Sequence, residues 1–278
     1  TDQLSKLTKK DIVAFANKYF GENYVAVLKR KGENKDISKV EKPPITPVET
    51  NRDAQSDFVK QVNNMPATAV KPVWLDYNKD VQKAKIGPAE VLYVQNTDNS
   101  LFRLRYRFEM GTWNNKKLSL AAQYLQFLST DKMSAEEITK AFYEIACSFN
   151  VSASSEFTTV TIEGLQENFT KAVKLFEDVL KNSKENEEAL KSLKARIIKS
   201  RTDAKVNKGA IMSGLVNYAR FGRNNPFNYT LSDADLNATT AAELVSILHN
   251  LNSYPHKILY YGPQPLAQFT AGLKTVHT

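Results

Sequence analysis

The stretch LFRLRYRFEMG, residues 101–111, carries the clearest structural signal in the chain, because its apolar and charged residues alternate. Apolar side chains occupy every second position from 102 to 110, and arginine or glutamate occupies the positions between them. Successive side chains of a β-strand point to opposite faces, so this alternation predicts a strand with one buried and one solvated face. Arginines and aromatic rings on opposite faces do not form a base-stacking platform, which argues against nucleic-acid binding here.

Further strands and helices are expected on both sides of this stretch. Strands are predicted at 90–95, 147–154, 158–165 and 257–261, and helices at 118–129, 135–146, 167–181, 187–206, 209–221 and 241–251. Ser134 is a good N-cap for the second helix, because Glu137 three residues later completes a capping box.

Composition places the chain among ordinary globular proteins. Of its 278 residues, 42% are hydrophobic and 24% are charged, which excludes a wholly disordered chain. No apolar run approaches the ~20 residues of a membrane span, so no transmembrane segment is expected. The single cysteine, Cys147, excludes an internal disulfide framework and a cysteine-rich zinc module. The net charge of +8 comes from interspersed charges of both signs, which favours a solvated surface over a nucleic-acid partner.

The N-terminal third is predicted to differ from the rest. Residues 1–32 are interpreted as the last helix and strand of a preceding domain, with the helix starting at Thr8 and the strand at 24–28. Prolines at 43, 44 and 47 indicate a linker over 33–82, because so long a loop is improbable inside one compact domain. An α+β domain is then expected at 83–255, followed by the start of another unit at 256–278.

An ungapped internal repeat relates residues 8–28 to residues 240–260. The matching pairs are Thr8 and Thr240, Asp11 and Glu243, Ile12 and Leu244, Val13 and Val245, Phe15 and Ile247, Ala16 and Leu248, Ala26 and Ile258, and Val27 and Leu259. Chance similarity of two amphipathic helix–strand units is the alternative explanation. If the repeat is real, the chain starts late in one structural unit and passes the same point in the next.

Catalytic motifs are absent from the sequence. His249, His256 and His277 lack an acidic or cysteine partner at metal-ligand spacing, and surface or capping roles are favoured for them. No nucleophile elbow, phosphate loop or dinucleotide fingerprint occurs. Cys147 lies at an apolar helix–strand junction and is interpreted as a core thiol rather than a nucleophile.

The order of motifs in residues 101–182 nevertheless resembles a known family. A strand ending in glycine is followed by a helix, a Ser-Ala-Glu-Glu-Ile helix, a Ser-x-Asn strand, a threonine-rich strand and a long amphipathic helix. The matching segments are 108–113, 120–128, 134–138, 147–150, 157–165 and 169–180. This order resembles the peptidase domain of the insulinase/pitrilysin family of zinc metallopeptidases. The resemblance covers about residues 83–278 and implies an α+β fold with a mostly antiparallel sheet and helices on one face.

The zinc-binding motif of that family is degenerate here. Active members carry His-x-x-Glu-His on the helix after the glycine, where two histidines bind zinc and the glutamate activates water. The corresponding positions are Gln123, Gln126 and Phe127, and no glutamate between 188 and 243 supplies the third ligand. Phenylalanine has no lone pair, and glutamine is not a base at neutral pH. The resemblance therefore implies an inactive domain of the C-terminal half, with no cofactor in this chain and zinc in a partner catalytic half.

What the resemblance implies for function is a role in enclosing substrate. Family members close two halves around an unfolded peptide, and the active half adds the substrate to an edge strand. The equivalent residues here, Asn150, Val151 and Ser152, are candidate substrate contacts. The expected partners are a catalytic peptidase half and peptide substrate, and the bacterial periplasm or cell envelope is the favoured location. The alternative is a structural or assembly module of the same fold without a role in proteolysis.

Overall fold

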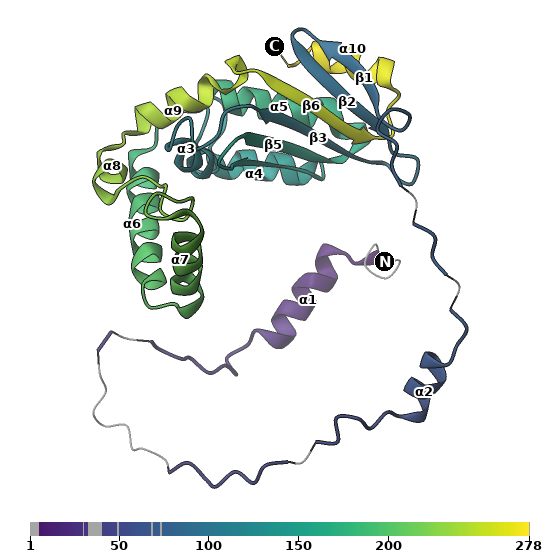
Figure 1. The fold of residues 1–278 in the computed structure, drawn as a ribbon, viewed down its shortest axis with the longest axis vertical. Helices are drawn as coiled ribbons and strands as arrows, with labels where there is room; N and C mark the ends of the chain where they lie inside the picture. Colours follow the sequence, from purple (N-terminus) through teal and green to yellow (C-terminus); the bar gives the residue numbers. More distant parts are fainter. Residues whose placement is uncertain are drawn as a thin grey trace. The chain divides into compact units, whose positions relative to one another are not determined.

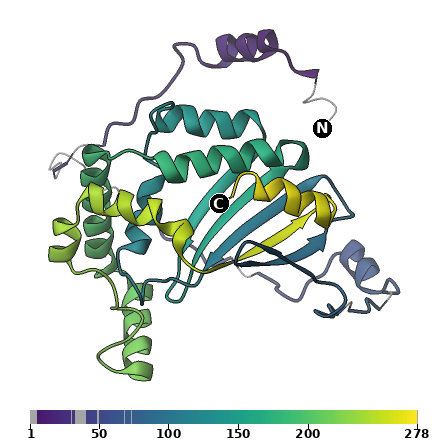
Figure 2. The same ribbon diagram turned by 90° about the horizontal axis from the view of Figure 1, so that it is seen from above.

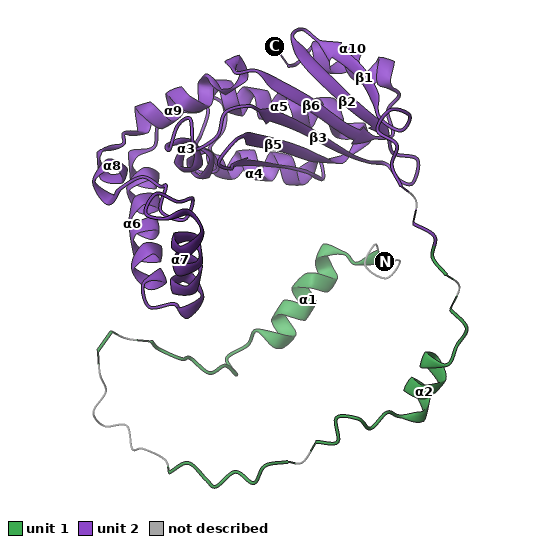
Figure 3. Ribbon diagram, viewed as in Figure 1, with its two compact units in different colours: residues 1–70 green, residues 71–278 purple. Residues whose placement is uncertain are grey.

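A computed structural model describes residues 6–29, 31–32, 41–48, 50–67, 69–72 and 74–277. The chain divides into two compact units, residues 1–70 and residues 71–278 (Figure 3). None of the helices described is long and apolar enough to cross a membrane.

The first unit contains two helices, α1 (Lys9–Tyr19) and α2 (Asp57–Asn63). Helix α1 begins with the predicted capping box, in which Thr8 and Asp11 exchange hydrogen bonds. No residue of either helix is buried. Residues 24–28, predicted to form a strand, are not in a strand here, and their side chains are exposed. A strand exists only where a neighbouring strand accepts its backbone hydrogen bonds.

The predicted linker is less uniform than its composition indicates. Its residues 33–40 lie outside the described part of the chain, and α2 interrupts the remainder. The compact second unit begins at residue 71 rather than at 83.

The second unit is built on a six-stranded sheet of order β1-β2-β6-β3-β5-β4 (Figure 1). The strands are β1 (Gln82–Ile86), β2 (Ala89–Gln95), β3 (Leu101–Phe108), β4 (Cys147–Ala153), β5 (Thr158–Leu165) and β6 (His256–Gly262). Only β2 and β6 pair in parallel, whereas the other four neighbouring pairs are antiparallel. The mostly antiparallel sheet is therefore confirmed.

Eight helices accompany the sheet in the described part of this unit. They are α3 (Leu118–Leu125), α4 (Ala135–Glu144), α5 (Phe169–Asn182), α6 (Glu187–Ala204), α7 (Lys208–Phe221), α8 (Asp233–Ala238), α9 (Ala241–His249) and α10 (Leu266–Lys274). Helix α3 ends four residues earlier than predicted. The amide N–H groups of Phe127 and Leu128 donate to carbonyls three residues back, which tightens the chain into a turn after Leu125.

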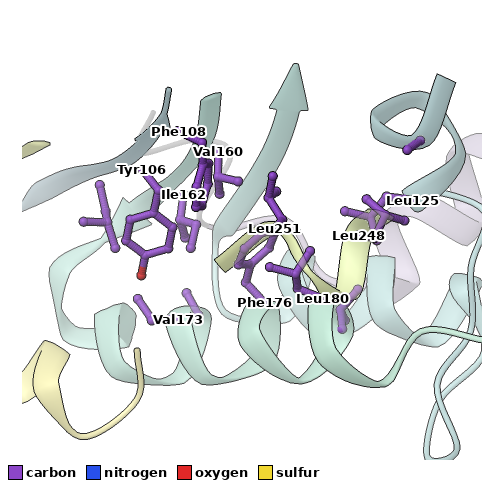
Figure 4. Packing of buried hydrophobic residues seen from close by; sticks show 14 of the residues in the cluster. Tyr106, Phe108, Leu125, Val160, Ile162, Val173, Phe176, Leu180, Leu248 and Leu251 are labelled. Atoms are coloured by element: carbon purple, nitrogen blue, oxygen red, sulfur yellow. The ribbon is translucent and has the colours of Figure 1, made fainter. Parts of the chain in front are cut away.

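The core lies between one face of the sheet and its helices. Val160 and Ile162 of β5 face Val173 and Phe176 of α5 (Figure 4). At the other end of the sheet, Phe269 of α10 stacks on Tyr260 with ring centroids 4.1 Å apart. Figure 2 shows α10, the yellow helix, lying across the strands. The alternation seen in residues 101–108 is reproduced as alternating exposed and buried residues along β3, as one covered face requires.

The expected boundary between residues 255 and 256 is wrong. Strand β6 begins at His256 and lies inside the sheet, hydrogen-bonded to β2 on one side and to β3 on the other. Phe269 and Leu273 of α10 are fully buried in the same core. Residues 256–277 are therefore an integral part of the domain, and the short apolar run at 258–261 is its central strand rather than the start of another unit.

Candidate functional site

The predicted site positions meet at a groove between helix α3 and strand β4. A cavity of about 440 Å³ is bounded by α3, α4 and the first half of β4. Gln123 and Gln126 line it from the α3 side, and Asn150 and Val151 line it from the strand side. The sequence separates these two pairs by more than 20 residues, so the fold brings them together. Most of the remaining wall is apolar, including Ile138 of α4.

A second cavity of about 340 Å³ continues past Gln123. It is lined by Ala153 and Ser154 at the end of β4, and by Tyr229 and Arg201 from the helical part of the domain. Gln123 lines both cavities. The two hollows therefore follow the length of β4, with Gln123 between them. An elongated site of this shape suits an extended chain better than a compact small molecule.

Strand β4 is the edge of the sheet. Among the strands of the described residues it pairs with β5 alone, from Cys147 opposite Gly164 to Ala153 opposite Thr158. An edge strand presents backbone N–H and C=O groups that the sheet leaves unpaired, which is a template for one more strand. Ala146, with φ of 49°, turns the chain from α4 into this strand.

The loop after β3 sets the position of α3 relative to this edge. The Thr112 and Trp113 amides donate to the Ser154 and Ser155 carbonyls at 2.8 and 2.9 Å. Gly111 makes that approach possible, because a Cβ at this position would collide with the backbone of Ser155. The glycine of the sequence motif thus fixes the distance between the start of α3 and the end of β4.

The two glutamines give the groove a neutral, amide-lined wall. The Gln123 side-chain amide donates to the Ser119 carbonyl at 3.2 Å, and that of Gln126 donates to the Gln123 carbonyl at 3.0 Å. Both bonds use the amide nitrogen, and neither amide oxygen accepts a hydrogen bond from the residues described. A side-chain amide donates and accepts hydrogen bonds as a peptide group does, but it takes up no proton at neutral pH.

Two predicted positions lie apart from the others. Phe127 does not line either cavity, because it follows the end of α3 and packs against the core. The Arg196 guanidinium of α6 lies 5.7 Å from the centre of its ring. Ser152 also lies outside the lining of both cavities. The structure therefore unites Gln123, Gln126, Asn150 and Val151 but not Phe127 or Ser152.

Few titratable side chains line the groove. Burial raises the pKa of the Cys147 thiol, although a hydrogen bond with the Leu165 backbone partly opposes the shift. The thiol is therefore protonated at neutral pH and is a poor nucleophile. No cluster of three or more His, Cys, Asp or Glu side chains suited to a metal ion occurs within the described ranges.

Sequence reasoning missed the residues that close the far end of the groove. The Lys116 ammonium lies 4.1 Å from the ring centre of Tyr229. Arg201 of α6 forms an ion pair with Asp233 of α8. Both contacts join segments more than 30 residues apart, and no motif marks them in the sequence. Only the packing of α6, α8 and their connecting loops brings them to the end of β4.

Comparisons with known proteins agree with this architecture. Residues 112–234 match the model of a family described as insulinase, peptidase family M16. The inactive domain of a peptidase M16 from Pseudomonas fluorescens is similar in structure, with a TM-score of 0.61 and 20% identity over 71% of this chain and 50% of that one. No curated protein matches the chain.

Longer proteases share the fold. The ferredoxin protease FusC, in complex with Arabidopsis ferredoxin, has a TM-score of 0.61 and 17% identity over 98% of this chain and 28% of that chain. The periplasmic protease PqqL from Escherichia coli has a TM-score of 0.60 and 14% identity over 97% of this chain and 28% of that chain. The present chain thus spans half or less of the length of these structures. Residues 112–234 therefore resemble the insulinase family, peptidase family M16, and the sheet domain shares the fold of the M16 peptidase structures.

Proposed function

We propose that this domain is a non-catalytic wall of a peptidase, which holds an extended peptide in the groove between α3 and the edge strand β4. The observation that carries the proposal is the meeting of Gln123 and Gln126 with the free edge of β4 around one elongated groove. The similarity to a peptidase M16 inactive domain supports a non-catalytic role.

The groove has the chemistry that an unfolded peptide requires. The edge of β4 offers backbone groups to a peptide that adds as a further strand, and such main-chain hydrogen bonds are indifferent to sequence. The Gln123 and Gln126 amides offer donors and acceptors along the opposite wall. Apolar wall residues such as Ile138 and Phe142 provide contact area for side chains. The site therefore favours extended conformation over any particular sequence.

Peptide hydrolysis is assigned to a separate catalytic half. Zinc binding takes about four ligands of the histidine, cysteine or carboxylate type, and among the residues that line this groove only Cys147 is of these types. Gln126 stands where the general base of an active member would stand, and an amide does not deprotonate water. Zinc and the attacking water therefore belong to the partner half, and this domain contributes binding alone.

The first unit is assigned to a preceding domain of the same fold. Helix α1 has the capping box of α9, but its apolar residues Ile12 and Phe15 are 58% and 57% exposed, whereas Leu244 of α9 is fully buried. An exposed apolar helix face calls for a covering layer. We assign that layer to a preceding domain, in which residues 24–28 pair as β6 does here.

Peptide binding by the whole chain tests the proposal. The probe is a fluorescein-labelled, unfolded casein peptide, and its anisotropy is measured during titration with the protein. Gln123→Arg places a long cation between the two cavities at an exposed position and is expected to raise the Kd at least about fivefold. Gln268→Arg, at an exposed position of α10, is the matched control and is expected to leave the Kd within about twofold.

The same samples test the non-catalytic assignment. After incubation with excess zinc and desalting, the chain is expected to retain no stoichiometric zinc and to leave the peptide intact. Cleavage that a chelator abolishes contradicts the assignment. Failure of the parent chain to bind peptide contradicts the binding role and favours the alternative of a structural module.

A further inference from the structure

The sheet face that points away from the helices carries an apolar strip between two cations. The pairing register places Lys83, Leu92, Leu259 and Arg105 side by side across β1, β2, β6 and β3. Leu92 and Leu259 are half-buried, and Lys83 and Arg105 are exposed. At ~4.8 Å between strands, the two cationic residues stand about 14 Å apart with the leucines between them.

The next row of the sheet continues this pattern. Val94 of β2 lies beside Tyr261 of β6, and Tyr261 lies beside Arg103 of β3. Tyr261 is 43% exposed although it is large and lies within the sheet. The apolar side chains of β2 and β6 therefore form a strip two rows long, with Lys83 on the β1 side and Arg103 and Arg105 on the β3 side.

Two neighbouring cations on this face are already paired with carboxylates. Arg103 Nε donates to Glu163 at 2.7 Å, and Lys257 lies 3.6 Å from Glu90. Lys83 and Arg105 have no carboxylate within ion-pair distance among the residues described. Lys83 and Arg105 can therefore form ion pairs with an acidic ligand, one on each side of the apolar strip.

The strip lies at the floor of a groove of about 630 Å³. The segment before β1 forms part of its wall through Leu75 and Tyr77, whose side chains are 64% and 73% exposed. Both residues belong to the same compact unit as the sheet. This side of the groove therefore exposes apolar side chains to solvent. Exposed apolar surface that is rimmed by charge is typical of a site for another protein segment.

We propose that this groove binds an acidic protein segment that places large apolar side chains over Leu92 and Leu259 and carboxylates against Lys83 and Arg105. Charge complementarity selects this occupant. A basic segment would meet like charges on both sides of the strip, and a neutral apolar one would leave both cations without partners. Arg105 can bind a carboxylate through two parallel N–H groups, which fixes the position of the segment along the strip.

The binding depends on burial and charge together. Burying two or three aliphatic side chains against the strip supplies most of the favourable binding free energy, from which the cost of ordering the segment is subtracted. The two exposed ion pairs add less to affinity but decide which segment is accepted. This site lies on the open face of the sheet, whereas the peptide groove follows the edge strand β4, so the proposal does not rest on the proposed function.

A pair of designed peptides tests the groove. The probe is a short fluorescein-labelled peptide of alternating glutamate and leucine, and the comparison peptide has lysine in place of glutamate. We expect the intact chain to bind the acidic probe at least about tenfold more tightly at low salt, with affinity falling as NaCl is added. Arg105→Glu is expected to weaken binding about fivefold or more, and the double variant with Lys83→Glu further.

Two controls separate this site from other causes of binding. Lys174→Glu reverses an exposed charge on α5, the helix that covers the opposite face, and is expected to change the Kd less than about twofold. Gln123→Arg, which blocks the edge-strand groove, is expected to leave the acidic probe bound. Equal affinity for the two peptides, or an Arg105→Glu variant that binds as the parent does while remaining folded by circular dichroism, overturns the proposal.

Discussion

At the scale of single residues, Gly111 links the fold to the site. Its missing side chain lets the loop after β3 lie directly on the backbone of Ser155, and the neighbouring amides hydrogen-bond across that contact. The start of α3 is held against the end of β4 in this way. A methyl group at position 111 would have to displace backbone atoms, which are less compliant than the end of a flexible side chain.

Alanine substitutions at two glycines are predicted to have opposite effects. Gly111→Ala is expected to lower the free energy of unfolding by about 2–4 kcal/mol, because backbone must move to admit the Cβ. Gly272→Ala, in α10 with open space around the Cβ, is expected to raise it by about 0.5–1 kcal/mol through the helix preference of alanine. Urea unfolding measures both variants. A Gly111→Ala protein as stable as the parent contradicts the close approach.

At the scale of elements, helices α1 and α9 show the same capping signal in two environments. Each begins with a threonine cap and an acidic residue three positions later, and each forms both bonds of the capping box. Helix α9 buries Leu244, Val245 and Leu248, whereas α1 buries none of its residues. Local signals therefore start the helix in both places, but packing stabilises only α9 within the structure described.

Removing the N-cap side chains of α1 and α9 is predicted to change the stability of the sheet domain in one case only. Thr240→Ala is expected to lower the free energy of unfolding of the sheet domain by about 1 kcal/mol, because the first turn of a packed helix loses its cap. Thr8→Ala removes the same hydrogen bond from α1 and is expected to leave the main urea transition unchanged. Its effect should be confined to a small loss of helical circular dichroism. A shift of the main transition by Thr8→Ala would mean that α1 unfolds together with the sheet domain.

At the scale of the whole molecule, a buried cluster ties the end of the chain to the sheet and to α5. His256 Nδ1 faces the Tyr254 carbonyl at 2.9 Å, and its Nε2 lies 2.9 Å from His277 Nε2. His277 Nδ1 lies 2.7 Å from a Glu177 carboxylate oxygen, and the Asn252 amide donates to the other oxygen at 2.8 Å. The ring of Tyr106 stacks on His277 at 4.2 Å. His256 and His277, which sequence analysis assigned to surface or capping roles, thus pack against the core.

Stability is predicted to fall in mild acid because of this cluster. Burial lowers the pKa of His256, and the nearby His277 adds to the shift against the opposing effects of the Tyr254 carbonyl and Glu177. As the pH falls through the ordinary histidine range near 6.5, the unfolded chain takes up a proton that folded His256 does not. The free energy of unfolding therefore decreases with falling pH, by at most about 1.4 kcal/mol per pH unit for this one group.

Urea unfolding between pH 7.5 and 5 measures this dependence, over a range that brackets ~6.5. His256→Gln keeps a polar group toward His277 but does not titrate, so its stability is expected to depend less on pH. His249→Gln, at an exposed position at the end of α9, is the control and is expected to keep the pH dependence of the parent. A parent chain whose stability rises toward pH 5 would contradict the assignment.

The candidate site was only partly predictable from the sequence. Gln123 and Gln126 were identifiable because the family resemblance aligns them with the positions of the first zinc ligand and the general base, and Asn150 and Val151 because they lie on the expected strand. Arg201 and Tyr229 carry no such local signal, since their position at the groove depends on how α6 and the loop after α7 pack. Phe127 was placed on α3, but the turn after Leu125 directs it to the core.

The sequence by itself determined where most strands and helices form, because alternation, helical spacing and capping boxes act over a few neighbouring residues. The tertiary structure alone decided which strands pair. Residues 24–28 and 256–260 occupy matching positions of the internal repeat, yet among the described residues only the second set is a strand, since β2 and β3 share hydrogen bonds with it. A helix satisfies its backbone within itself, whereas a strand needs neighbours that local sequence cannot specify.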